Sequence, residues 1–107
     1  MIEINGEAWR VFLVSPNHPA LRRPNGTAAL GSCDDILKAI FINQNVSYSL
    51  FKRILSPELV HAYMFSHKIT LGTYQEEALA DMVATYGEDI INLTNLFIKN
   101  KKWETYN

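Results

Sequence analysis

Two polar side chains, Glu58 and His61, lie three residues apart in a segment that has the apolar period of a helix. At 100° per residue, both fall inside the stripe that Leu50, Phe65 and Phe51 define on that helix. A buried carboxylate or imidazole needs a partner, because an unpaired polar group in a dry environment costs about 1–3 kcal/mol. The two side chains therefore either satisfy each other or a backbone carbonyl, or they belong to a functional site.

A second predicted helix carries acidic residues that could complement His61. It opens at Thr73 with a capping-box pattern, in which the Glu76 side chain bonds back to the start of the helix. That assignment leaves Glu77 as the free acid, four residues before Asp81. Two like charges at this spacing repel by about 0.2–0.5 kcal/mol, so a cation, a donor or water must lie in front of them. From this helix alone, a solvated face is the simpler interpretation.

The elements that position these residues indicate an α+β fold, in which a small N-terminal antiparallel or mixed sheet precedes three helices. The Asn5-Gly6 pair predicts a hairpin turn, and Gly87 predicts the left-handed C-cap of the second helix. Ser47 is the candidate N-cap of the first helix. Strands are predicted over residues 2–4, 8–14, 28–32 and 38–43, and helices over residues 48–65, 73–86 and 88–100.

The composition is that of one small domain, residues 1–107, with a tail at 101–107 that is expected to fray. Ten basic and eleven acidic residues give a net charge of −1, which disfavours nucleic acid and anionic membranes as partners. The lone cysteine, Cys33, indicates a reducing compartment. Neither a leader nor a stretch of about 20 apolar residues is present, so we expect a cytoplasmic protein with no membrane insertion.

The order Glu58-x-x-His61 and then Glu77-x-x-x-Asp81 resembles the zincin metallopeptidases, whose His-Glu-x-x-His helix is followed by a helix with an acidic ligand. The chain is most similar to the small ImmA/IrrE-like metallopeptidases of bacteria and phages, to about residue 98. The resemblance implies a zincin-like fold with Glu58 as general base and His61 and Glu77 as zinc ligands. It implies that Asp81 supports a ligand without binding the metal. Further segments carry the resemblance: Ala8 to Pro16, Leu30-Gly31-Ser32-Cys33-Asp34, Gln75 to Asp81, and Tyr86-Gly87.

Pro57 departs from this family pattern, because it stands where the family has its first zinc-binding His. Catalytic zinc needs three protein ligands and an open fourth position. The resemblance therefore implies that His61 and Glu77 are vestigial ligands and that Glu58 is a vestigial base. Pro57 also removes one amide from the helix ladder at a local cost of about 3 kcal/mol, and the Ser56-Pro57 pair predicts a kink or a new helix start.

No cofactor is expected at this position unless another side chain replaces the lost ligand and restores zinc binding. His67 lies near the predicted end of the first helix, whereas His18 and Cys33 belong to the loop and sheet segments. Cys33 is not expected to act as a nucleophile, because no basic neighbour is placed to lower its pKa.

The resemblance, with its first zinc ligand lost, implies an inactive metallopeptidase domain that serves as a protein-binding module, encoded by a phage or another mobile element. Its protein or peptide partner is expected in the former substrate groove, between the strand at 38–43 and the helix of Glu58 and His61, where an extended peptide could be added to a sheet edge. One alternative is an active zinc peptidase with an altered ligand set. Another is a phage anti-defence or regulatory protein, including a nucleic-acid binder, which the basic residues at 99–102 leave open.

Overall fold

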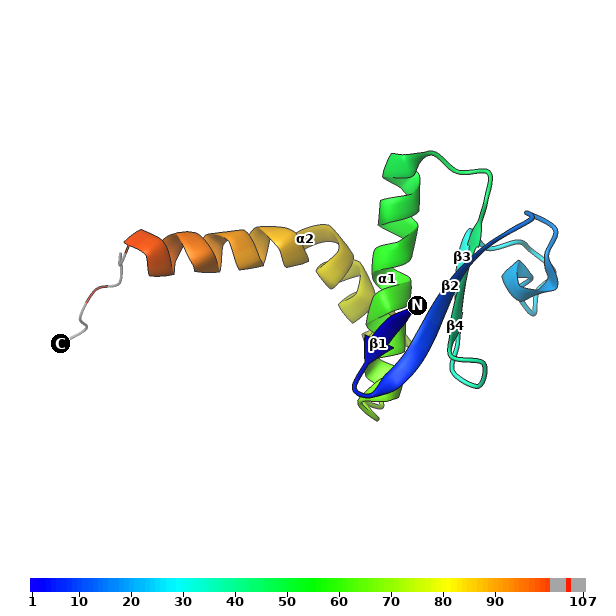
Figure 1. Cartoon of the computed structure of the whole chain (residues 1–107), viewed down its shortest axis with the longest axis horizontal. Helices are drawn as coiled ribbons and strands as arrows, with labels where there is room; N and C mark the ends of the chain where they lie inside the picture. The colour runs from blue at the N-terminus through cyan, green and yellow to red at the C-terminus, as the bar shows by residue number, and fades with distance from the viewer. Residues whose placement is uncertain (101–103, 105–107) are drawn as a thin grey trace.

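The computed structural model describes residues 1–100 and residue 104. A four-stranded sheet is followed by two helices, which confirms the α+β class (Figure 1). One helix, α1, lies along the sheet, and the other, α2, leaves the body of the domain (Figure 1). The elements are β1 (Ile2–Ile4), β2 (Glu7–Val14), the 3-10 helix η1 (Pro19–Leu21), β3 (Gly31–Asp34), β4 (Ala39–Asn43), α1 (Tyr48–Ser66) and α2 (Thr73–Asn100).

The sheet is mixed and has the strand order β1-β2-β4-β3. β1 pairs with β2 and β3 pairs with β4 in antiparallel fashion, whereas β2 and β4 are parallel. The predicted Asn5-Gly6 turn is confirmed, because both residues have the positive φ values, 49° and 79°, that a tight hairpin turn requires. The third strand lies at 31–34 and not at 28–32 as predicted. β4 has neighbours on both sides, so this strand offers no free edge at which an extended peptide could be added.

The core lies between the sheet and α1. Ile40 and Ile42 of β4 are fully buried in a cluster with Trp9 of β2 and Ala62 of α1. Phe41 points to the other face of the sheet, as the strand period predicts, and its ring stacks on that of His18 at 5.7 Å. This packing fixes which face of α1 is turned toward the sheet.

The first helix, α1, begins behind Ser47, whose hydroxyl accepts a hydrogen bond from the Leu50 amide at 3.3 Å. This confirms the predicted N-cap. Of the two predicted alternatives at Ser56-Pro57, a kink or a new helix start, the new start was wrong, because α1 continues through Pro57. Ile54 and Leu59 lie on opposite sides of the proline and both pack against the core, so tertiary contacts hold the two parts of the helix in one element despite the missing amide.

The second helix, α2, runs for 28 residues without a break, so the predicted third helix at 88–100 is the continuation of the second. Gly87 lies inside α2 and does not end it. A glycine inside a helix costs only about 1 kcal/mol relative to alanine, which the good helix-forming residues on either side outweigh. Because α2 projects, the radius of gyration is 16.9 Å, whereas a compact chain of this length has about 13 Å.

Two sequence-based expectations concern the ends and the hydropathy of the chain. Residues 101–103 and 105–107 of the predicted frayed tail, including Lys101 and Lys102, lie outside the described part of the structure. Within residues 1–100 and 104, no helix combines the length and the hydropathy that crossing a membrane requires.

Candidate functional site

His61 stands where α1 meets the first turns of α2, and its ring is only 12% exposed. Its Nδ1 lies 2.7 Å from Oε1 of Glu76, and its Nε2 lies 3.4 Å from Oε1 of Glu77. The two helices therefore touch at this point. The spacing argument did bring the correct pair of residues together.

Glu76 is the residue that sequence reasoning missed. The capping-box pattern assigned its carboxylate to the start of α2, but that carboxylate instead forms the short contact with His61. The Glu76 backbone amide donates to the carbonyl of Gly72 at 2.9 Å, so α2 closes its first turn through the backbone. The sequence did carry a signal for this contact. Glu76 and Glu77 are consecutive acids in the first turns of α2, so each can contact a different nitrogen of the His61 ring.

Glu58 is turned inward, toward the strands. Its Oε2 is buried and has no hydrogen-bond partner among the described residues. Burial raises the pKa of the Glu58 carboxyl; nearby His61 lowers it and Glu77 raises it further. β3 lies close against this part of α1, because a Cβ atom added to Gly31 would come within 2.6 Å of Ile54. The carboxyl is thus enclosed between α1 and β3 in a place that favours its neutral form.

Cys33 of β3 lies near the same acidic groups. Burial raises the pKa of its thiol to about 12, and the negative charges of Glu58, Asp35, Asp34 and Glu76 add to this effect. A thiol in this environment is a poor nucleophile, in agreement with the expectation from its neighbours in the sequence.

The remaining candidate ligands have other contacts. His18 caps η1 by accepting a hydrogen bond from the Ala20 amide at 3.0 Å. His67 ends α1, and its ring stacks on Tyr63 at 4.3 Å. Asp81 is exposed on α2. Within residues 1–100 and 104, no three His, Cys, Asp or Glu side chains are arranged to hold a metal ion.

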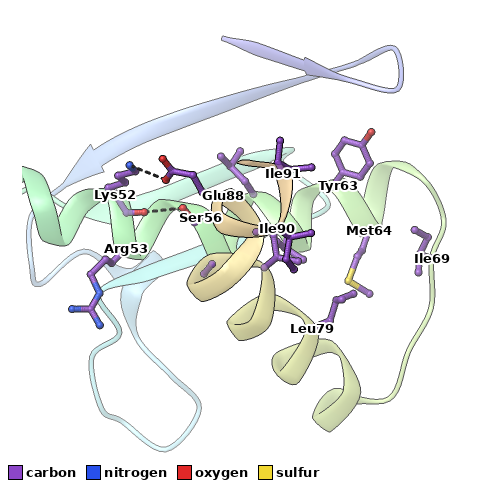
Figure 2. Close-up of a pocket in the computed structure, with 15 residues that line it drawn as sticks. Lys52, Arg53, Ser56, Tyr63, Met64, Ile69, Leu79, Glu88, Ile90 and Ile91 are labelled. Carbon is purple, nitrogen blue, oxygen red and sulfur yellow. Dashed lines mark hydrogen bonds and ion pairs between the residues drawn. The ribbon is translucent and has the colours of Figure 1, made fainter. Parts of the chain in front are cut away.

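An apolar groove lies on the side of α1 that faces α2, with a volume of about 890 Å³ (Figure 2). At one end, Lys52 of α1 forms an ion pair with Glu88 of α2 at 3.6 Å, and Arg53 lies beside it (Figure 2). The sequence did not predict this groove, because its position depends on how the two helices cross. Its main apolar lining residues are Leu59, Val60, Met64, Leu79, Val83 and Ile90.

The resemblance to zincin peptidases rests on this chain's own residues. Comparisons of the chain with protein-family models, with curated proteins and with solved structures found no match. The zincin-like interpretation of the fold and of the site stays a prediction, to be tested on the residues themselves.

Proposed function

We propose that this chain is a catalytically inactive, zincin-like domain that acts by binding another protein chain. The observation that carries the proposal is the arrangement of His61 between Glu76 and Glu77, with Pro57 in the position where a further metal ligand would be needed. His61 and Glu77 are arranged as two of the three protein ligands of a zinc site would be.

The contact between His61 Nε2 and Glu77 Oε1 supports this interpretation. At 3.4 Å it exceeds the usual range of a direct hydrogen bond. Two ligands of one tetrahedral zinc ion, each about 2.1 Å from the metal, are separated by about 3.4 Å. The short bond from Nδ1 to Glu76 is the kind that orients a metal-binding imidazole, since a carboxylate on one nitrogen directs the other toward the metal.

Position 57 lacks the third ligand. Residues 57 and 61 are four apart in one helix, so they share a face, and a proline side chain has no donor atom for a metal. His61 and Glu77 do not make a set that fits catalytic zinc, which needs three protein ligands.

Binding of another protein is supported by the apolar surface that the domain exposes. Large apolar side chains line the groove between α1 and α2, and more of them follow along the projecting part of α2. Contiguous apolar patches of this kind mark protein interaction sites on soluble chains. The enclosed position of Glu58 and the exposed groove suggest that the binding surface lies beside the former site and not in it.

The decisive experiment restores the missing ligand. Zinc should stabilise Pro57→His by about 2.7 kcal/mol at a hundredfold excess over its dissociation constant, which raises the melting temperature by roughly 10–20 °C. Pro57→Ala is the matched control, because it repairs the helix amide without adding a donor, and it should not respond to zinc. Adding Glu77→Ala to Pro57→His should abolish the response.

An active zinc peptidase with an altered ligand set is the second candidate, favoured by the same 3.4 Å separation. It requires that the natural chain bind zinc in a one-to-one ratio and cleave peptides. Metal analysis of the natural protein after zinc loading separates the two candidates, since stoichiometric zinc would replace our proposal. A Pro57→His protein that is indifferent to zinc would remove the zincin assignment itself.

A further inference from the structure

The strand β2 has a free edge beyond the end of β1. Residues 10–14 of β2 pair with β4 on one side, whereas on the other side β1 reaches only Glu7, Ala8 and Trp9. Figure 1 shows β1 beside the first part of β2, while the rest of the strand continues past it. No strand in the described part of the chain pairs with residues 10–14 on that side, so the sheet ends there in an open edge.

The backbone hydrogen bonds show which groups of β2 point to this edge. The Arg10 amide donates at 3.1 Å to the carbonyl of the residue before β4, and the Val14 carbonyl accepts at 2.8 Å from the amide of the residue after β4. Backbone polar groups alternate between the two sides of a strand, so those of Val11 and Leu13 point away from β4. Each of these two residues leaves an amide donor and a carbonyl acceptor at the edge, without a partner in the described part of the chain.

Apolar side chains on both faces of the sheet are exposed at the same edge. Leu13 lies opposite Ile42 of β4, but Ile42 is fully buried and Leu13 is 58% exposed. On the other face, the Phe12 ring stacks on Phe41 of β4 at 5.6 Å and is 41% exposed. Leu13 and Phe12 are therefore covered on the side of β4 and open on the side of the edge. One further strand would cover both of them.

The edge of β2 carries few of the features that keep edge strands from pairing. Proteins protect such edges with charged side chains, prolines or bulges. Residues 10–14 read Arg-Val-Phe-Leu-Val, and their register with β4 has no bulge. Arg10, at one end, is the charged residue of this segment. The other edge strand, β3, is half-buried and ends in the charged Asp34, so β2 offers the better edge for an added strand.

We propose that the edge of β2 at residues 10–14 binds an extended segment of another protein as an added strand, antiparallel to β2 as β1 is. The partner's residues opposite Val11 and Leu13 are apolar, because they join the face of the sheet on which Val11 packs against the core. Its residue opposite Arg10 is acidic, since Arg10 is exposed and forms no ion pair among the described residues. This inference goes beyond the proposed function, because no residue of β2 lines the groove between α1 and α2.

A second copy of this chain is a poorer occupant of the edge. Two β2 strands that pair antiparallel about Phe12 would set Ser15 of one copy opposite Trp9 of the other. Ile2 of β1 already lies opposite Trp9, so the chain that follows β2 in the second copy would meet β1. A flexible segment of another protein can leave the edge before it reaches this place.

Fluorescence anisotropy with the labelled peptide Ser-Thr-Val-Tyr-Val-Glu-Ser tests the proposal. In antiparallel pairing its two valines lie opposite Leu13 and Val11, and its glutamate lies opposite Arg10. The natural protein should bind this peptide saturably. The same peptide with both valine amides N-methylated should bind at least tenfold more weakly, because it lacks the donors that reach the edge. Equal binding of the two peptides, or no saturable binding, overturns the proposal.

A proline at position 13 removes a donor from the protein side of the edge. The Leu13 amide points away from β4, so Leu13→Pro leaves the pairing of β2 with β4 intact, as prolines on edge strands do. This variant should bind the peptide at least tenfold more weakly, with unchanged circular dichroism. Leu13→Ala is the matched control, because it shortens the same side chain but keeps the amide, and it should lose less affinity than Leu13→Pro.

A charge exchange tests the acidic position of the partner. Arg10→Glu should weaken binding of the glutamate peptide several-fold, because like charges then lie opposite each other. Replacing the peptide's glutamate by lysine should restore the affinity for Arg10→Glu and lower it for the natural protein. Equal affinities of both proteins for both peptides would contradict the acidic residue in the partner.

Hydrogen exchange of single amides, followed by NMR, examines the edge in the natural protein. The Phe12 and Val14 amides face β4 and should exchange slowly with or without the peptide. The Val11 and Leu13 amides should exchange rapidly in the free protein and at least tenfold more slowly when the peptide is saturating. Unchanged exchange of these two amides at saturation overturns the added strand.

Val83→Lys distinguishes this site from the groove between α1 and α2. Val83 lines the groove, so the variant should bind the peptide as the natural protein does. Loss of binding in Val83→Lys, with binding retained in Leu13→Pro, would place the peptide in the groove. That outcome overturns the site on β2 and leaves the proposed function standing. Stoichiometric zinc in the natural protein would contradict the proposed function and leave the strand site standing.

Discussion

The two halves of α2 share one helical apolar pattern but differ in what they contact. In the first half, residues 73–86, Ala80 is fully buried and Glu76 reaches His61 of α1, although Leu79 and Val83 are still 36% and 42% exposed. In the second half, residues 87–100, no residue is buried, and Phe97 is 52% exposed. The helical period is the same in both, so burial depends on whether an opposing surface is present and not on the pattern alone.

This difference separates the forces that hold the two halves. Contacts of the first half belong to the folding of one chain, and their contribution to stability does not depend on protein concentration. The large apolar side chains of the second half are about half exposed, so changing them removes less buried surface. Substitutions in the two halves should therefore differ in the size of their effect on the free energy of unfolding.

The largest effect is expected from Ala80→Glu in the first half. Ala80 has no exposed surface at the packing of α2 against the domain, so a glutamate there would bury an unpaired charge. We expect a loss of about 3 kcal/mol or more in the free energy of unfolding, independent of protein concentration. Urea unfolding at two protein concentrations measures it.

Ala78→Glu is the control for this prediction, because Ala78 lies in the same half of α2 but is exposed. The same change there should alter the free energy of unfolding by less than about 0.5 kcal/mol. Equal losses at positions 78 and 80 would mean that the first half of α2 is not packed as described, and the contrast between the two halves would fail.

Features that depend on a few neighbouring residues could be predicted from the sequence. The Asn5-Gly6 turn and the Ser47 cap are local, because a positive φ or a side-chain acceptor is sufficient to cause each of them. The meeting of His61 with Glu77 followed from the spacing of two motifs that a known family places together. The fold class followed from the change of period between the two halves of the chain.

Features that depend on competition between local and tertiary forces could not be predicted. Pro57 and Gly87 are both helix-breaking signals, yet both lie inside helices, since packing on each side of Pro57 and the surrounding residues of Gly87 outweigh the local cost. The capping-box pattern suited Glu76 to a cap, but a nearly buried imidazole is a stronger partner for a carboxylate than a solvated amide. The groove between α1 and α2 could not be predicted from the sequence either, because its position depends on how the two helices cross.

Gly87→Ala tests the continuity of the two halves and should have an intermediate effect. Inside a helix, alanine is favoured over glycine by about 1 kcal/mol. The added Cβ would lie 3.3 Å from Cγ1 of Val83, which must move by a few tenths of an ångström, so we expect a net gain of about 0.5 kcal/mol in thermal unfolding. Gly26→Ala is the control. Gly26 has a φ of 86°, and an added Cβ would have no neighbour within 4 Å, so this variant should lose about 1 kcal/mol of stability through backbone strain alone. A loss at position 87 as large as that at 26 would show that Gly87 ends a helix, as its sequence pattern predicted.

The smallest effect is expected in the pH dependence of the packed half, where Glu58 lies beside His61 and Glu77. Burial holds the pKa of Glu58 above its ordinary value of 4.5, so the folded state retains this proton in a pH range where the unfolded state has lost it. Because the folded state then binds more protons, the free energy of unfolding falls as the pH rises from about 4.5 through the raised pKa. The stabilising contribution of the Glu58 carboxyl is fully present only below that range. Glu58→Gln removes this titration, so its stability relative to the natural protein should increase with pH across the same range and level off above it. The effect is limited to one partly buried group, and urea unfolding at several pH values between 4 and 8 measures it. Parallel stability curves for the two proteins would mean that Glu58 is solvated in the folded state, and the enclosed site between α1 and β3 would be wrong.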